Sequence, residues 1–150
     1  MLDFIDVSNS IVTIDAIGAQ KEIAKKIISE KGDYVFAVKD NHPKLAEAIR
    51  DHFELVHETG LVESGVRSKK TKDKQASREE ERFYAICEIP ESMEELTSEW
   101  AGARSIGQAI TSSIRNGQYT DEVRYFISSR APLVGEFAKC VRNHLSLIHI

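Results

Sequence analysis

The sequence has little of what several broad classes of protein require. Its two cysteines, Cys87 and Cys140, lie far apart and form no CxxC pair, so neither a disulfide framework nor a zinc site is indicated, and we expect two buried free thiols. No stretch approaches the roughly 20 consecutive apolar residues that a membrane span needs, and the first residues lack a basic segment followed by an apolar one. We therefore expect a cytoplasmic protein that does not contact a membrane.

The motifs of several enzyme classes are missing as well. The sequence contains no GxGxxG, P-loop or GxSxG element, and its five histidines show no HExxH or other ligand spacing. These absences disfavour nucleotide binding and serine hydrolysis. They also indicate that the histidines lie on the surface or on helix faces.

The charge is acidic in sum but uneven along the chain. The formal net charge of −4 argues against a dedicated nucleic-acid coat protein. Residues 67–74 are nevertheless basic, with one acid, Asp73, among Arg67, Lys69, Lys70, Lys72 and Lys74. Because this stretch has almost no apolar content, we expect a mobile loop. It is either a solvated linker or a loop that contacts a phosphate backbone.

Apolar periodicity predicts a strand, a helix and a second strand at the start of the chain. Residues 11–14 form a short β-branched run, residues 19–28 carry apolar side chains at the spacing of one helical face, and residues 34–38 form a second apolar run. Two strands joined by one helix should be parallel, with a right-handed crossover. This topology places Asp15 and residues 39–41 at the same carboxyl edge of the sheet, where open α/β sheets usually bind ligands.

The rest of the chain predicts a long helix, an antiparallel region and a final helix. Pro43 begins a helix that ends at Gly60, with an apolar stripe at Leu45, Ile49, Phe53 and Val56. A period of two then indicates strands near residues 83–87, 106–114 and 123–127, with a hairpin turn at 116–117 and one short helix over 93–100. A last helix begins after residue 132. The predicted fold class is α/β with an antiparallel β half.

Four separated blocks of the sequence share motifs, in the same order, with one known family. Residues 11–24 (IVTIDAIGAQKEIA) are similar to an IVTIDAxGxQKxIA signature, and residues 32–41 (GDYVFAVKDN) to a GDYxxxxKxNQ segment. Residues 106–129 match a later β region, and residues 141–144 (VRNH) match the start of a last catalytic helix. The chain therefore resembles the H-repeat-associated transposases of bacterial insertion sequences.

The resemblance implies a DDE transposase with an RNase H-like core, in which two Asp and one Glu hold two Mg²⁺ ions. Hard divalent ions prefer oxygen ligands, and a pair of them stabilises the attacking and leaving oxygens of an in-line phosphoryl displacement. Asp15 corresponds to the second Asp, so it is the predicted catalytic residue and metal ligand; a turn or helix-cap residue is the alternative. The implied partner is DNA, and a homo-oligomer is considered for full-length members. The predicted DNA contacts are Lys39, Arg67, Lys69, Lys70, Lys72, Lys74 and Arg78.

The resemblance also implies one incomplete catalytic domain over residues 1–150. Its predicted parts are an RNase H-like βαβ unit (1–64), the basic loop with the antiparallel region (65–130), and the start of the last helix with an aberrant tail (131–150). The family's first Asp would precede Met1, and its Glu has no counterpart after His144. Of a central His-Gly-Arg-x-Glu element, only Arg78 and Glu80 are present.

These departures predict a transposase fragment, truncated at both ends, that is inactive alone because two of the three carboxylates are missing. Two alternatives stay open. The chain is either a non-catalytic DNA-binding remnant, or the poorly folded product of a broken gene.

Overall fold

The computed structural model describes residues 7–15, 19–143 and 147–149, the last range by its backbone alone. The predictions for the remaining residues lie outside this part of the chain. They include the turn after Asp15, the missing ligands near both ends, and the tail that begins at His144 apart from the backbone of residues 147–149.

The start of the chain folds as the predicted βαβ unit. Strand β1 (Ser10–Ile14) runs parallel to β2 (Asp33–Val38), with Ile14 opposite Phe36, and helix α1 (Lys21–Ser29) connects the two strands. Residues 34–38 are all buried, as expected for a strand that is covered on both faces. The prediction of a parallel pair is confirmed.

Helix α2 (Pro43–Thr59) follows β2 and buries the predicted stripe of Leu45, Ile49, Phe53 and Val56. Pro43 suits the first turn of a helix because an N–H at this position would have no partner within the helix. Even α2, which at 17 residues is the longest described helix, lacks the length and apolar character needed to cross a membrane, as do the other described helices.

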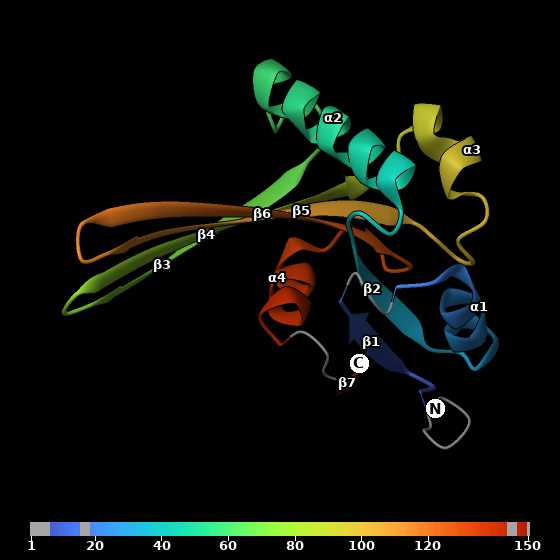
Figure 1. Cartoon of the computed structure of the whole chain (residues 1–150). Coiled ribbons are helices and arrows are strands. Elements are labelled where there is room, and N and C mark those ends of the chain that lie inside the picture. Colours follow the sequence, from blue (N-terminus) through green and yellow to red (C-terminus); the bar gives the residue numbers. More distant parts are fainter. Residues whose placement is uncertain (1–6, 16–18, 144–146, 150) are drawn as a thin grey trace.

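Two long hairpins form an arm that extends from the rest of the molecule (Figure 1). Strand β3 (Arg67–Gln75) pairs with β4 (Arg78–Glu88), β5 (Ser105–Arg115) pairs with β6 (Gln118–Ser128), and β4 pairs with β5 between them. Asn116 and Gly117 have φ values of 51° and 80°, and a two-residue hairpin turn of the I′ type requires positive φ at both positions. The predicted antiparallel region is confirmed, and we call β3–β6 the arm.

The prediction of a mobile loop over residues 67–74 is wrong, because these residues form β3. The strand is paired with β4 over all nine of its residues, although it has almost no apolar side chains. Strand β4 supplies both the hydrogen-bond partners and the opposite charges that hold it. Lys72 lies opposite Glu81 and Lys74 opposite Glu79, and such cross-strand pairs stabilise a sheet.

The short helix predicted over residues 93–100 is shorter than expected. A 3₁₀ turn (η3, Glu91–Met93) leads into α3 (Glu94–Thr97), and the N–H of Trp100 then donates to the carbonyl of Thr97 in a further turn. Trp100 is buried beyond the helix, with its ring 6.3 Å from that of Phe36.

Helix α4 (Val134–Arg142), the predicted last helix, lies on the opposite side of the sheet from α2 and α3 (Figure 1). Strand β7 (Leu147–His149) pairs with β1, so the described strands form one seven-stranded sheet in the order β3-β4-β5-β6-β2-β1-β7. One apolar core joins the sheet to α1, α2 and the α3 region, and a second core joins it to α4.

Each core contains one of the two cysteines, which are free and buried as predicted. Burial raises the pKa of the Cys87 thiol to about 12 and that of Cys140 to about 11. Neither thiol is therefore reactive near neutral pH.

Helix α4 packs against the sheet at Gly107, so the substitution Gly107→Ala should destabilise the protein. A Cβ at this position would come within 2.5 Å of the buried Phe137 ring, and overpacking of this kind costs about 1–3 kcal/mol. Thermal unfolding followed by circular dichroism measures the loss.

Gly135→Ala is the matched control, because nothing lies within 4 Å of a Cβ there; it should be neutral or stabilising by up to about 1 kcal/mol. Equal stability of the two variants would contradict the close packing of Phe137 on α4 against Gly107. If the unmodified chain itself unfolds in a broad, non-cooperative thermal transition, the result would favour the alternative that the chain is a poorly folded product of a broken gene.

Candidate functional site

A cleft opens at the carboxyl edge of β1 and β2, where the sequence predicts ligand binding. It has a volume of about 600 Å³ and lies between the ends of these strands, the beginning of α2, and β6. Asp15, Lys39 and Asp40 line it together. The other charged residues of its lining are Glu47, Arg50, Glu122 and Arg124.

Asp15 directly follows β1 and is exposed at this cleft. It is not the cap of α1, because the N-cap residue of that helix is Gln20. The Asn41 amide donates to the carbonyl of Ala19 at 3.3 Å, and His42 Nε2 lies 2.8 Å from the same oxygen. These contacts tie the chain before α1 to the start of α2.

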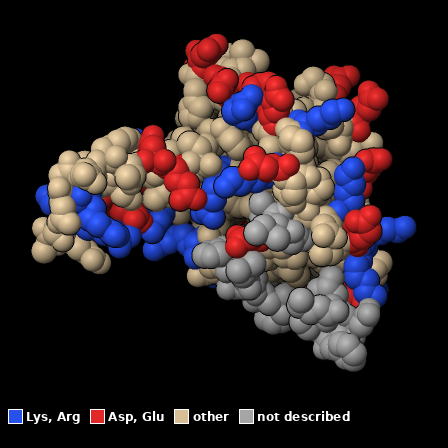
Figure 2. All heavy atoms as spheres, in the orientation of Figure 1, with Lys and Arg blue, Asp and Glu red and all other residues tan. Residues whose placement is uncertain are grey.

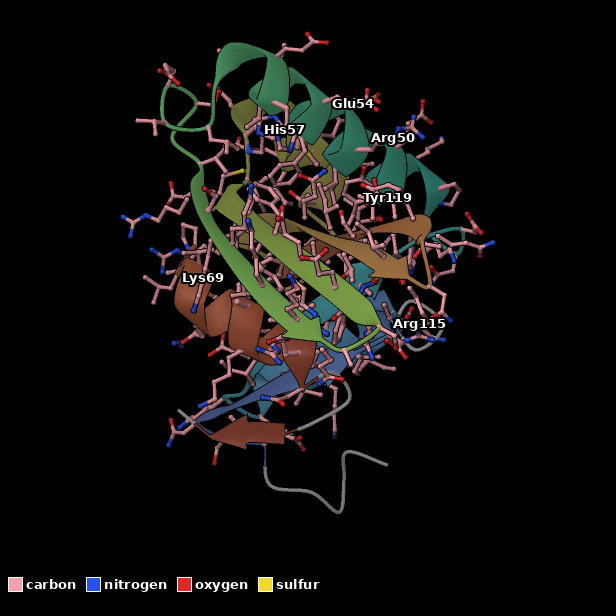
Figure 3. All side chains as sticks on the ribbon, turned by 90° about the vertical axis from the view of Figure 1, so that its left-hand side faces the viewer. Arg50, Glu54, His57, Lys69, Arg115 and Tyr119 are labelled. Atoms are coloured by element: carbon pink, nitrogen blue, oxygen red, sulfur yellow. The ribbon has the colours of Figure 1, made fainter. Side chains whose placement is uncertain are left out.

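The cations of the cleft differ in their availability. Arg50 contacts Glu47, Asp51 and Glu54 at 3.4–4.0 Å, so its charge is largely balanced on α2; Figure 3 shows Arg50 and Glu54 on this helix. Lys39 is exposed and has no ion pair with any described residue. Of these two, Lys39 is the one free to meet an anion.

The described residues do not fit the two-ion magnesium site that the resemblance implies. They contain no group of three or more His, Cys, Asp or Glu side chains that could hold a metal ion. Mg²⁺ takes a near-octahedral set of oxygens, usually one or two carboxylates with water and substrate phosphates. Asp15 offers one such carboxylate.

Strand β3 places its basic side chains on two opposite faces of the arm, because side chains alternate along a strand. Arg67 and Lys69 belong to one face. Lys69 lines a hollow against α4, and it lies next to this helix in Figure 3. Lys70, Lys72 and Lys74 belong to the other face, so the predicted basic loop is divided into two groups.

The three lysines of that other face are paired with acids of β4. Lys70 and Lys72 contact Glu81 at 3.4 and 3.6 Å, and Lys74 contacts Glu79 at 3.9 Å. Exposed pairs such as these contribute at most about 1 kcal/mol each. Their effect is to balance the charge of this face.

Arg78 and Glu80, the two residues similar to the family's central element, form an ion pair inside the arm. Arg78 Nη2 donates to Glu80 Oε2 at 2.5 Å, and Arg82 contacts the other carboxylate oxygen. Glu80 is buried, and the hydrogen bond from Arg78 is the largest cause that lowers its pKa. Arg78, predicted to contact DNA, is therefore engaged by Glu80.

Four basic residues outside the predicted set lie on the same side of the arm as Lys69. Arg82, Arg124, Lys139 and Arg142 line hollows between the arm and α4. The sequence does show, within each element, which basic side chains share a face: alternation gives this for β4 and β6, and helical spacing gives it for residues 139 and 142. That the three elements meet at one place depends on the tertiary fold.

Curated proteins are similar to this chain along nearly its whole length. "Putative protein YbfL" of Escherichia coli (strain K12) is 36% identical over 96% of this chain and 38% of its own length. "H repeat-associated putative transposase YhhI" of the same strain is 35% identical over the same shares. "Putative transposase YncI" of Escherichia coli O157:H7 is 30% identical over 99% of this chain and 38% of its own length. The chain thus spans a little over a third of these relatives.

Other comparisons give no match. No family model matches the chain, and no solved structure matches it.

Glu80→Gln should destabilise the arm, because the buried carboxylate is held by two arginines. We expect a loss of about 1–3 kcal/mol at pH 7, the usual range for removing one partner of a buried charged hydrogen bond. The pKa of Glu80 is lowered in the folded state, so its contribution is complete above the ordinary value of 4.5 and is lost as the pH falls through the lowered value. The free energy of unfolding, measured from pH 7 downward, should therefore fall less steeply below pH 4.5 in the Glu80→Gln variant than in the unmodified chain.

Glu81→Gln is the control from the next position on the strand, where the pairs are exposed. Its effect should stay below about 1 kcal/mol. The same loss in both variants would show that burial of Glu80 does not matter.

Proposed function

The chain is a transposase-family protein of the H repeat-associated type, and from this premise we propose that it is the DNA-binding part of an RNase H-like DDE catalytic domain. The observation that carries the proposal is the cleft, where Asp15, at the carboxyl end of β1, lies beside Lys39, at the end of β2. Parallel strands bring their functional residues to this edge.

Lys39 and the basic side chains of the arm that have no ion pair with a described residue, such as Lys69, bind the phosphates of DNA in this proposal. An exposed ammonium group without an ion pair neutralises a phosphate at little cost, because it gives up no internal contact. Asp15 lies where the bound strand enters the cleft, and it offers one carboxylate to a magnesium ion. Because the described residues supply no complete ligand set, the role assigned to this chain is to bind and position DNA.

A chain with a net charge of −4 can bind DNA when its cations are gathered on one surface. In Figure 2 much of the Lys and Arg of the arm lies along its lower side, on which α4 lies in Figure 1. Clustered charge of this kind sets the local potential, whatever the net charge of the molecule.

The whole chain should therefore bind a short DNA duplex in a salt-dependent manner. We expect a complex in a gel-shift titration at about 50 mM NaCl, with affinity falling more than tenfold by about 200 mM, because each phosphate contact releases condensed counterions. No shift at the lower salt concentration would overturn the proposed function.

The chain alone should not cut DNA, because the described residues contain no group of three or more side chains that could hold a metal ion and the two-ion mechanism needs its ligands together. Supercoiled plasmid incubated with Mg²⁺ and the unmodified chain should show no more nicking than plasmid incubated with the Asp15→Asn variant. Mg²⁺-dependent nicking that this substitution abolishes would contradict the prediction.

A further inference from the structure

A chain of three hollows connects the Asp15 cleft to Lys69 on the α4 side of the arm. Arg124 lines both the cleft and a second hollow of about 270 Å³. Tyr84 and Arg142 line this second hollow and a third, of about 500 Å³, which lies between β3 and α4 and contains Lys69. The shared residues make the three hollows neighbours. We call the second and third hollows the α4 groove.

The α4 side of the arm carries an excess of positive charge. The strand register gives the residues that share this face, and α4 adds its own. Its basic residues are Arg67, Lys69, Arg78, Arg82, Arg115, Arg124, Lys139 and Arg142, and its acids are Asp73, Glu80, Glu122 and, on α4, Glu136, which is paired with Arg130.

Three of these cations both line the α4 groove and are free to bind. Lys69, Lys139 and Arg142 are exposed, and none forms an ion pair with a described residue. Arg82 and Arg124 line the groove as well, although Arg82 is bonded to Asp73 and Glu80, and Arg124 lies 3.8 Å from Glu122. The free cations thus surround the hollow next to α4.

Tyr84 marks the junction of the two hollows. Its side chain is buried, and its hydroxyl has no hydrogen-bond partner among the described residues. Burial raises the pKa of this hydroxyl, while the nearby charges of Arg82, Arg142 and Arg124 lower it. A buried hydroxyl beside three arginines is an unsatisfied polar group in a site suited to an anion.

The opposite side of the arm also has a hollow, of about 380 Å³, but four acidic residues line it beside the lysines Lys72 and Lys74. Lys70, Lys72 and Lys74 are paired there with Glu79 and Glu81. Asp121 of β6 also belongs to this face by the strand register. Positive and negative charges alternate, so a phosphate approaching one lysine meets a carboxylate nearby.

On the basis of the proposed function, we propose that the α4 groove binds the sugar-phosphate backbone of DNA and leads it to the Asp15 cleft. Lys69, Lys139 and Arg142 make the phosphate contacts. Arg124, which the groove shares with the cleft, is the point where the backbone passes from one to the other. Lys70, Lys72 and Lys74 take no part.

Two triple variants of the whole chain test this assignment, because each removes three positive charges and leaves the same net charge. The first is K69Q/K139Q/R142Q, on the α4 side, and the second is K70Q/K72Q/K74Q, on the opposite side. All six residues are exposed, and thermal unfolding checks that both variants stay folded. Fluorescence anisotropy of a labelled DNA duplex, titrated at several NaCl concentrations, gives the affinity and its salt dependence.

We expect the α4-side variant to bind about 30-fold or more weakly at low salt, with the slope of log K against log salt reduced by about 2 to 3, as the loss of three phosphate contacts requires. The opposite-side variant should stay within about threefold of the unmodified chain, because its lysines make no phosphate contacts.

An equal loss in the two variants, or a larger loss in the opposite-side variant, would overturn the α4 groove while leaving DNA binding itself in place. No binding by the unmodified chain would overturn the proposed function and the groove together. The two failures are therefore distinguishable.

Discussion

The structure depends on β2, which is paired along both of its edges. It runs parallel to β1 on one side and antiparallel to β6 on the other, so it joins the βαβ unit to the arm. Arg130, just after β6, reinforces the junction: it bonds to both carboxylate oxygens of Glu136 on α4 at 2.8 Å and lies 3.4 Å from Asp33 at the start of β2. Without this central strand, the cleft would lose one wall and the main-chain pairing that joins the βαβ unit to the arm would be lost.

Much of the fold could be predicted because its signals are local. The buried strand β2, the stripe of α2 and the turn at Asn116 and Gly117 each follow from a short periodic pattern or from turn chemistry. The cleft followed from topology, since parallel strands align their carboxyl ends and so bring Asp15 and Lys39 together. Strand β3 could not be predicted from its composition, because its stability lies in a partner strand.

The basic surface could be predicted only in part, for a related reason. The charged run of residues 67–74 is visible in the sequence, but alternation sends Lys69 to one face of the arm and Lys70 to the other. Lys139 and Arg142 lie on α4, far along the chain, and reach Lys69 because α4 packs on the sheet, with Phe137 against Gly107. A surface assembled from distant elements depends on tertiary packing, which no short pattern records.

The place of β3 at the outer edge of the sheet has a consequence for the behaviour of the molecule in solution. An edge strand presents unpaired main-chain groups that can accept a strand from another molecule, which is a common route to aggregation. Here the edge carries lysines along most of its length. Lys70, Lys72 and Lys74 are paired with acids, whereas Arg67 and Lys69 have no ion pair with a described residue. Two copies that approach edge to edge therefore repel each other at these two residues, which protects the arm against sheet extension.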